Sequence, residues 1–530
     1  MRKILLIFTL IPVMIFSQEA NQGQSIELPE FVITGKQTVT VPKALKKKPD
    51  PISIVSPEFF TPTVSTEQFS LSDISEPFMP QIILYPISKY INGQLEVGAG
   101  VHTIPTGKFN IQKAFESSVI FANVSGLNIN EYENNSQYNE TAAGAGAMFF
   151  ISSDSDFLSG SSISVNGNYY QNSYRFFASA NPEFERKTQT YNAKLKFENQ
   201  ASSIFNYNFS TSFENLTFKE NDLSEILIRP SLDIKFIVGS TALLFGGLLE
   251  NQSLKNNLST ITSYNYFSAY GKFRYNISNG IILDAGASYY KSENEDLVTP
   301  VAKLTTKLNK NLTLFVEYNP TLKNKTFKNF LEQNRYFNFG AMDNFSEKDK
   351  FKIKGAVRYQ FDKYFEINLG GAFSKIDNYL YFGDVTTQGF YDLRNDDEIK
   401  KIEGFLNLIF YQGPFGMFYA DFIYNSVKFE NGNYVPFEPE YKANAFYKYK
   451  FDFGFGIEPS IRYYSKSYVN INNNGQISDC INAAVKGTFN LLNNLELFVE
   501  FQNLLNRNNY LLPGYTEKPF DVLGGVKYSW

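Results

Sequence analysis

The feature that most constrains the fold is a strict alternation of two kinds of side chain in segment after segment. Between residues 93 and 530, apolar and aromatic residues occupy every second position of segments separated by turn residues. In the last segment, one face carries Phe520, Val522, Gly524, Val526, Tyr528 and Trp530. In another, Phe351, Ile353, Val357, Tyr359 and Phe361 alternate with Lys352, Lys354, Arg358 and Gln360. A period of two predicts β-strands with two unlike faces.

The chemistry of the two faces indicates a membrane barrel rather than a soluble sandwich. The chain contains 52 Phe and 35 Tyr, and only 19% of its residues are charged. The aromatics lie on the apolar face, while the opposite face is openly charged on strand after strand. A soluble core would hold fewer tyrosines, because each buried hydroxyl needs a partner. We therefore expect an all-β, antiparallel transmembrane β-barrel, with lipid outside and water in its lumen.

The lengths of the connections support the same fold. Short and long connections largely alternate along the chain, as the periplasmic turns and outer loops of a membrane barrel do. The longer ones fall near 129–141, 175–186, 320–349, 382–399, 430–438, 469–477 and 506–517. Counting through them predicts about 22 strands, with both ends of the chain in the periplasm.

The chain divides into three parts. Residues 1–17 are typical of a signal peptide, since Arg2 and Lys3 precede the apolar run 4–16. That run is too short to span a bilayer as a helix, and no later run reaches the required length. Residues 18–90 are rich in proline, which predicts an extended periplasmic segment. Residues 91–530 form the predicted barrel.

Several functions are disfavoured by what the composition lacks. The net charge of −4 does not suggest nucleic acid as a partner. The single histidine, His102, and the single cysteine, Cys480, exclude chemistry that needs two histidines or a Cys/His cluster in one chain. We therefore expect no enzyme, no cofactor and no metal site. The acidic run 396–398 is interpreted as a solvated loop, with a divalent-cation site as the alternative.

The C-terminal stretch 495–530 resembles the end of TonB-dependent outer-membrane receptors. Asn503, Leu504, Asn506 and Arg507 match a turn motif of that family, and Pro513, Gly514 and Tyr515 match a loop motif. The resemblance implies that the last strand is the signal for the barrel-assembly machinery. The residues that carry this signal are Phe520, Val522, Val526, Tyr528 and Trp530.

A second motif resembles the TonB box, the extended segment that such receptors offer to TonB. It consists of Glu27, Leu28, Pro29, Glu30, Phe31, Val32, Ile33, Thr34 and Gly35. An extended apolar strand of this kind can add to the edge of a partner's sheet, in TonB or another periplasmic protein. The alternative is a strand-like stretch of linker. Residues 36–90 are too few for the plug domain of the family, so the chain resembles a plugless member.

These observations predict a protein of the cell outer membrane of a Gram-negative bacterium, in contact with outer-membrane lipid. The resemblance implies uptake of a nutrient or other solute, with loops 320–349 and 382–399 contacting the substrate or a surface partner. Seven lumenal cations would set the field inside: Lys352, Lys354, Arg358, Lys442, Lys448, Arg462 and Lys527. Two alternatives stay open, a scaffold in an outer-membrane complex and a passive diffusion channel. The substrate, the use of TonB, the filling of the lumen and the oligomeric state also stay open.

Overall fold

The computed structural model describes residues 92–530, apart from 152–157, 200–203, 221, 256–260, 279, 340–343, 362–363, 384–387 and 414–415. The predicted signal peptide, the segment 18–90, the TonB-box-like motif and the predicted lack of a plug lie outside these residues. Within the described residues, no helix has both the length and the apolar character needed to cross a bilayer.

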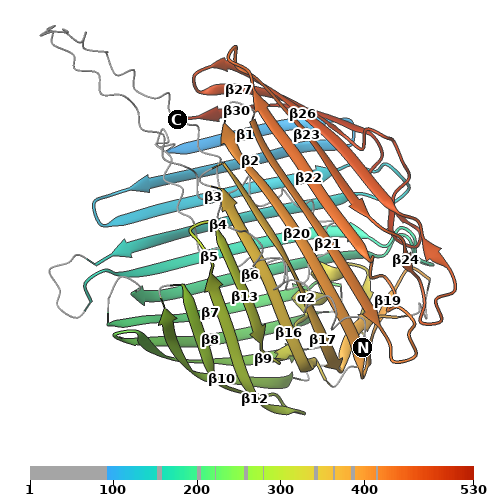
Figure 1. The fold of residues 1–530 in the computed structure, drawn as a ribbon. Coiled ribbons are helices and arrows are strands. Elements are labelled where there is room, and N and C mark those ends of the chain that lie inside the picture. Colours follow the sequence, from blue (N-terminus) through green and yellow to red (C-terminus); the bar gives the residue numbers. More distant parts are fainter. Residues whose placement is uncertain are drawn as a thin grey trace, which may run out of the picture. The chain divides into compact units, whose positions relative to one another are not determined.

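The described residues form a closed, antiparallel β-barrel of 22 strands, as the sequence predicts (Figure 1). Each strand pairs with its neighbours in the chain, and β1 closes the ring by pairing with β30. The first eleven strands are β1 (Gly93–Gly100), β2 (Thr103–Ala114), β3 (Ser118–Ile129), β4 (Tyr138–Phe150), β5 (Ser161–Arg175), β6 (Glu185–Asn199), β7 (Phe205–Phe218), β8 (Leu223–Val238), β9 (Thr241–Lys255), β10 (Ile261–Ser278) and β11 (Ile281–Lys291). The others are β12 (Asp296–Lys307), β13 (Leu312–Tyr318) with its continuation β14 (Leu322–Asn324), β16 (Ser346–Phe361), β17 (Phe365–Asp377), β20 (Ile399–Gly413), β21 (Gly416–Lys428), β22 (Tyr441–Lys450), β23 (Phe455–Tyr464), β26 (Cys480–Leu492), β27 (Leu495–Gln502) and β30 (Asp521–Ser529).

The two faces of the wall differ as the alternation predicts. Phe351, Ile353, Val357 and Phe361 of β16 are exposed on the outer face, where lipid would cover them. The inner face carries charge in register: Lys527 of β30 lies opposite Glu96 of β1 and Glu496 of β27. Opposite charges facing each other across a strand pair stabilise the sheet modestly. The aromatic rows therefore surround one cylinder and do not pack against a second sheet.

The two ends of the barrel differ in their connections. At the end of the barrel where β1 begins and β30 ends, short turns such as 239–240 and 493–494 join the strands. One connection at this end is longer than expected, since β4 ends at Phe150 and β5 begins at Ser161. At the opposite end, seven connections are long and the remaining four are short, which confirms the predicted asymmetry in outline.

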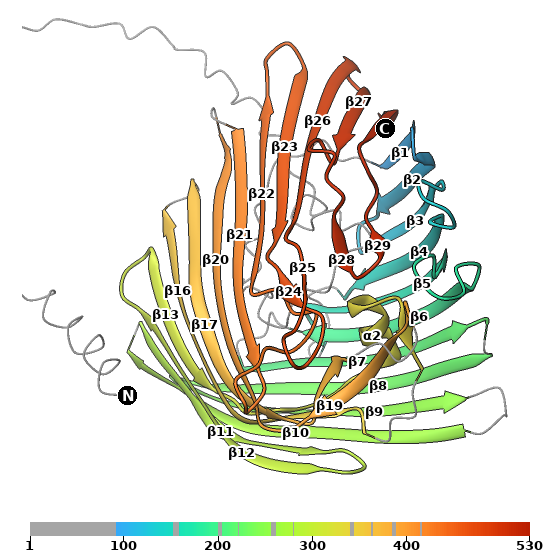
Figure 2. The ribbon, with the colours of Figure 1, turned by 90° about the vertical axis from the view of Figure 1, so that its right-hand side faces the viewer.

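The long connections at this opposite end carry their own secondary structure. They contain the helix α2 (Phe327–Gln333) and the short strands β15 (Phe337–Asn338), β18 (Tyr379–Phe382), β19 (Tyr391–Asp396), β24 (Ser467–Tyr468), β25 (Gln476–Ile477), β28 (Tyr510–Leu512) and β29 (Tyr515–Thr516). Helix α2 begins at a capping box in which Thr326 and Asn329 satisfy each other's backbone N–H groups. Figure 2 shows α2, β19, β24 and β28 within the outline of the ring of strands.

Candidate functional site

The long connections pack together into one folded unit, which we call the loop cap. Its parts are the described residues of 130–137, 176–184, 325–345, 378–398, 429–440, 465–479 and 503–520. Its core is aromatic, with Phe176, Phe330, Phe337 and Tyr391 almost wholly buried. Burial of this apolar surface is what makes loops of this length fold instead of extending into water.

The loop cap joins connections from opposite parts of the ring. The backbone N–H of Ala180, between β5 and β6, donates to the carbonyl of Gln388, between β17 and β20. Gly389 (φ +80°) lies against Ser179 so closely that a Cβ would come within 2.4 Å of the Ser179 Cα. Glycine is therefore required here both for its backbone conformation and for its lack of a side chain. Since these connections lie almost half-way round the ring from each other, the loop cap bridges the mouth of the barrel.

Arg186, at the start of β6, contacts several segments at the centre of the loop cap. Its side chain is 2% exposed and lies 2.7 Å from the Glu220 carboxylate. Its guanidinium also donates to the backbone carbonyls of Arg335 and Phe337, at 3.0 and 2.9 Å. Four aromatic rings surround the cation at 4.5–5.6 Å, those of Phe176, Phe218, Phe337 and Phe339. A buried cation is stable only when it is paired and hydrogen-bonded in this way.

Two tyrosines form a second junction. The rings of Tyr336 and Tyr515 stack with their centroids 3.5 Å apart. The Tyr515 hydroxyl donates to the Gly389 carbonyl at 2.7 Å, and Gly514 supplies the positive φ of the β28–β29 turn. Burial raises the pKa of Tyr515 above its ordinary range, so the hydroxyl stays protonated and remains a donor. The loop motif found in the sequence thus forms one side of this junction.

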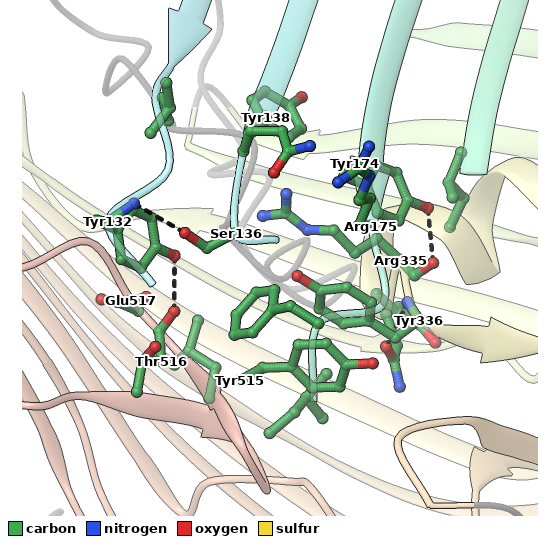
Figure 3. A pocket seen from close by; sticks show the side chains of 18 of the residues that line it. Tyr132, Ser136, Tyr138, Tyr174, Arg175, Arg335, Tyr336, Tyr515, Thr516 and Glu517 are labelled. Carbon is green, nitrogen blue, oxygen red and sulfur yellow. Dashed lines mark hydrogen bonds between the residues drawn. The ribbon is translucent and has the colours of Figure 1, made fainter. Parts of the chain in front are cut away.

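A pocket of about 70 Å³ opens beside this junction, and we call it the outer pocket (Figure 3). Tyr132, Tyr174 and Tyr336 present rings to it, and Arg175 and Arg335 present guanidinium groups. Two of the tyrosines are fixed, since Tyr174 donates to the Arg335 carbonyl at 2.7 Å and Tyr132 to that of Thr516 at 2.8 Å. Ring faces and guanidinium donors suit a ligand that is flat or carries acceptor groups.

Glu332 of α2 also lines the outer pocket. Burial raises the pKa of this carboxyl above its ordinary value, and the Lys328 ammonium opposes that rise only in part. Because the Glu332 side chain also reaches solvent, this rise stabilises the neutral form only weakly.

A second cavity of about 150 Å³ lies between the loop cap and the inner face of β16, β17 and β20–β22, and we call it the lumenal chamber. Its charged lining groups are Lys323, Lys325, Glu347, Asp349, Lys352, Lys401, Glu403, Glu438 and Lys442. Gln333, Asn334 and Leu512 line both cavities. These three residues at the end of α2 and in β28 therefore form a shared wall between the outer pocket and the lumenal chamber.

The structure brings some of the sequence-predicted residues into this site. Both predicted loops, 320–349 and 382–399, supply parts of the loop cap, and Lys352 and Lys442 line the lumenal chamber. Other predicted lumenal cations belong to the wall. Arg358 pairs with Glu366 at 2.7 Å, and Lys448 lies 3.8 Å from Glu458.

The isolated candidates do not form a chemical centre. His102 packs edge-on against Tyr132, and Cys480 is buried at the start of β26. Across residues 92–530 as described, no group of three His, Cys, Asp or Glu side chains is arranged to hold a metal ion. The aromatic junctions and Arg186 were not predicted as site residues, and their only sequence signal was the loop motif at Gly514.

The predicted assembly signal lies on the outer face of the barrel. Phe520, Val526, Tyr528 and Trp530 are exposed there, and the backbone of Trp530 bonds to that of Gly93 where the barrel closes. The turn motif before it folds through Asn503, whose side-chain amide donates to the Arg507 carbonyl at 3.0 Å. The role of these residues in assembly stays a prediction.

These features define a class: a wide antiparallel barrel with a charged lumen, an apolar outer wall and folded loops across one mouth. No protein-family model matches the chain, and no curated protein matches its sequence. Solved structures do share the fold.

The FrpB iron transporter from Neisseria meningitidis superposes with a TM-score of 0.64 at 12% identity, over 84% of this chain and 82% of that one. The siderophore receptor PiuA from Acinetobacter baumannii gives 0.63 at 12% identity, over 83% and 82%. The copper transporter OprC gives 0.63 at 10% identity, over 83% and 80%. At such low identity the similarity concerns the fold alone.

Proposed function

We propose that this protein is an uptake receptor of the bacterial outer membrane that admits its solute through a gated mouth. The observation that carries the proposal is the loop cap, whose buried aromatic core spans a mouth that a passive diffusion channel would keep open. A scaffold would need neither the outer pocket nor the lumenal chamber behind it. Proteins of similar fold include an iron transporter, a siderophore receptor and a copper transporter, which supports the same class of function.

The N-terminal motif completes the proposal. Residues 27–35 would pair with TonB or another periplasmic protein by adding a strand to its sheet. Through this contact, the periplasmic partner would supply the energy that opens the loop cap, without a separate plug domain. The last strand, ending at Trp530, would be the signal that the barrel-assembly machinery uses to place the protein in the outer membrane.

The test combines two measurements on the full chain. In planar bilayers, we expect the intact protein to give little steady current. In cells grown on a defined mixture of amino acids, short peptides, sugars and chelated iron, we expect depletion of at least one component to depend on the protein. Deleting residues 27–35 should abolish that depletion while the protein still reaches the outer membrane.

The two rival functions give different results. A large steady current from the intact protein would identify a passive channel. Silence in the bilayer together with unchanged depletion in cells lacking the protein would reject uptake and leave the scaffold.

A further inference from the structure

The lumenal chamber contains almost equal numbers of positive and negative groups, five lysines and four carboxylates. Most of them are matched to one another. Three ion pairs are formed by Lys325 with Glu347 at 3.4 Å, Lys352 with Asp349 at 3.3 Å and Lys401 with Glu403 at 2.9 Å. The Glu438 carboxylate accepts from the side-chain amide of Asn425 at 3.0 Å and from the Tyr379 hydroxyl at 3.4 Å.

Among the lining groups that lack a hydrogen bond, two lie on adjacent strands of the inner face. Lys442 is only 6% exposed, and no described residue forms a hydrogen bond or an ion pair with it. The side-chain carbonyl of Asn425, also buried, accepts no hydrogen bond. A buried ammonium and a buried amide oxygen without partners both cost free energy, so each one calls for a ligand.

The two groups lie close enough to act on one small molecule. Ile423 of β21 faces Lys442 of β22, so Asn425, two residues further along the same face, is a diagonal neighbour of Lys442. Such neighbours have Cα atoms about 7–8 Å apart. Glu403 faces Asn425 directly from β20. One small patch therefore offers an ammonium without a hydrogen bond, an amide oxygen without a hydrogen bond and the Glu403 carboxylate.

We propose that the lumenal chamber binds a small zwitterionic solute, of the class of amino acids and short peptides. Its carboxylate meets the Lys442 ammonium, and its amino or amide N–H groups donate to the Asn425 carbonyl and the Glu403 carboxylate. A multivalent anion would face four carboxylates, and an uncharged solute would leave Lys442 unpaired. The cavity exceeds by about tenfold the 10–15 Å³ that one ordered water needs, so it admits a molecule of this size.

This inference deepens the proposed function and rests on it. Its test is equilibrium binding of radiolabelled trialanine to the full chain in detergent, with inorganic phosphate, acetate and ethylamine as competitors. Lys442→Met should weaken binding about 10- to 100-fold, as expected for losing one charge-assisted hydrogen bond. Lys442→Arg should recover part of the affinity, which a folding defect would not allow.

Lys196→Met is the matched control, because Lys196 is a cation of β6 outside the chamber that pairs with Glu198. It should leave binding unchanged. Equal loss in both Met variants, or competition by phosphate as strong as by unlabelled trialanine, would overturn the inference.

Uptake by cells separates this inference from the proposed function. Protein-dependent depletion of other nutrients, with no binding of trialanine, would reject the zwitterion site and keep the receptor. Absence of both binding and depletion would reject both.

Discussion

The Arg186 cluster makes a quantitative prediction about the loop cap. In Arg186→Met, the side chain still fills most of the space among the four rings, but the Glu220 carboxylate loses its ion-pair partner. Removing one member of a buried ion pair typically costs about 3–5 kcal/mol, because the other charge stays buried. Two backbone carbonyls of the 335–337 segment also lose their donor. We expect the loop cap to open locally while the barrel itself stays closed.

Hydrogen exchange of the purified protein measures this opening. Amides of β15, β19 and β28 report on the loop cap, and those of β7 report on the barrel wall. A loss of about 3–5 kcal/mol in local stability should speed exchange in the loop cap by about two to three and a half orders of magnitude. Exchange in β7 below the loop cap should change little.

Two further variants sharpen the test. Adding Glu220→Gln to Arg186→Met should restore part of the protection, because no unpaired charge is left buried. Lys196→Met breaks a more exposed pair, with 31% and 20% of the two side chains accessible, and should cost no more than about 1 kcal/mol. Unchanged exchange in the loop cap of Arg186→Met, or uniform acceleration over the whole barrel, would refute the reasoning.

Four more predictions address the loop cap and the closure of the barrel. Gly389→Ala should loosen the loop cap by more than Gly432→Ala in a hydrogen-exchange comparison, because both glycines have positive φ but only Gly389 has a neighbour in the way. The current of Arg186→Met in planar bilayers should exceed that of the intact protein; equal currents would mean that the loop cap is not the barrier. The protection factors of the loop-cap amides, which are corrected for the pH dependence of intrinsic exchange, should be slightly higher at pH 5 than at pH 8, since a raised carboxyl pKa means that stability falls as the pH rises above the ordinary value of 4.5, and Glu332→Gln should remove this difference. Trp530→Ala should lower the yield of folded protein in the outer membrane, whereas an alanine at the equally lipid-facing Phe149 should not.

The wall of the barrel could be predicted from the sequence because apolar residues that face lipid alternate with polar residues that face water along each strand. The faces of β16 and β30 follow the alternation residue by residue, since a shift of one position would put charge into lipid. Proline was a weaker guide. Pro230 lies inside β8, and the pairing with β9 is interrupted between Ile228 and Ser231, where the proline has no N–H to donate.

The loop cap could not be predicted in the same way. Its core comes from residues that follow no period, and its contacts join positions far apart in the chain. Arg186 donates to the carbonyl of Phe337, 151 residues away, and Tyr391 to that of Pro513, 122 residues away. An aromatic residue in a loop has the same appearance in the sequence whether it is buried or faces a ligand. Only the family-like motif at Gly514 and Tyr515 marked a place where a loop is fixed.

The outer pocket and the lumenal chamber are arranged in series, and this arrangement bears on mechanism. A solute held by the rings of the outer pocket is separated from Lys442 by Gln333, Asn334 and Leu512. The side-chain amide nitrogen of Asn334 is buried and has no hydrogen-bond acceptor. A wall that contains an unsatisfied donor is less stable than one that is fully bonded. A movement confined to Gln333, Asn334 and Leu512 would join the two cavities and leave Phe330 of α2 in the aromatic core, so opening need not cost the stability of the whole loop cap.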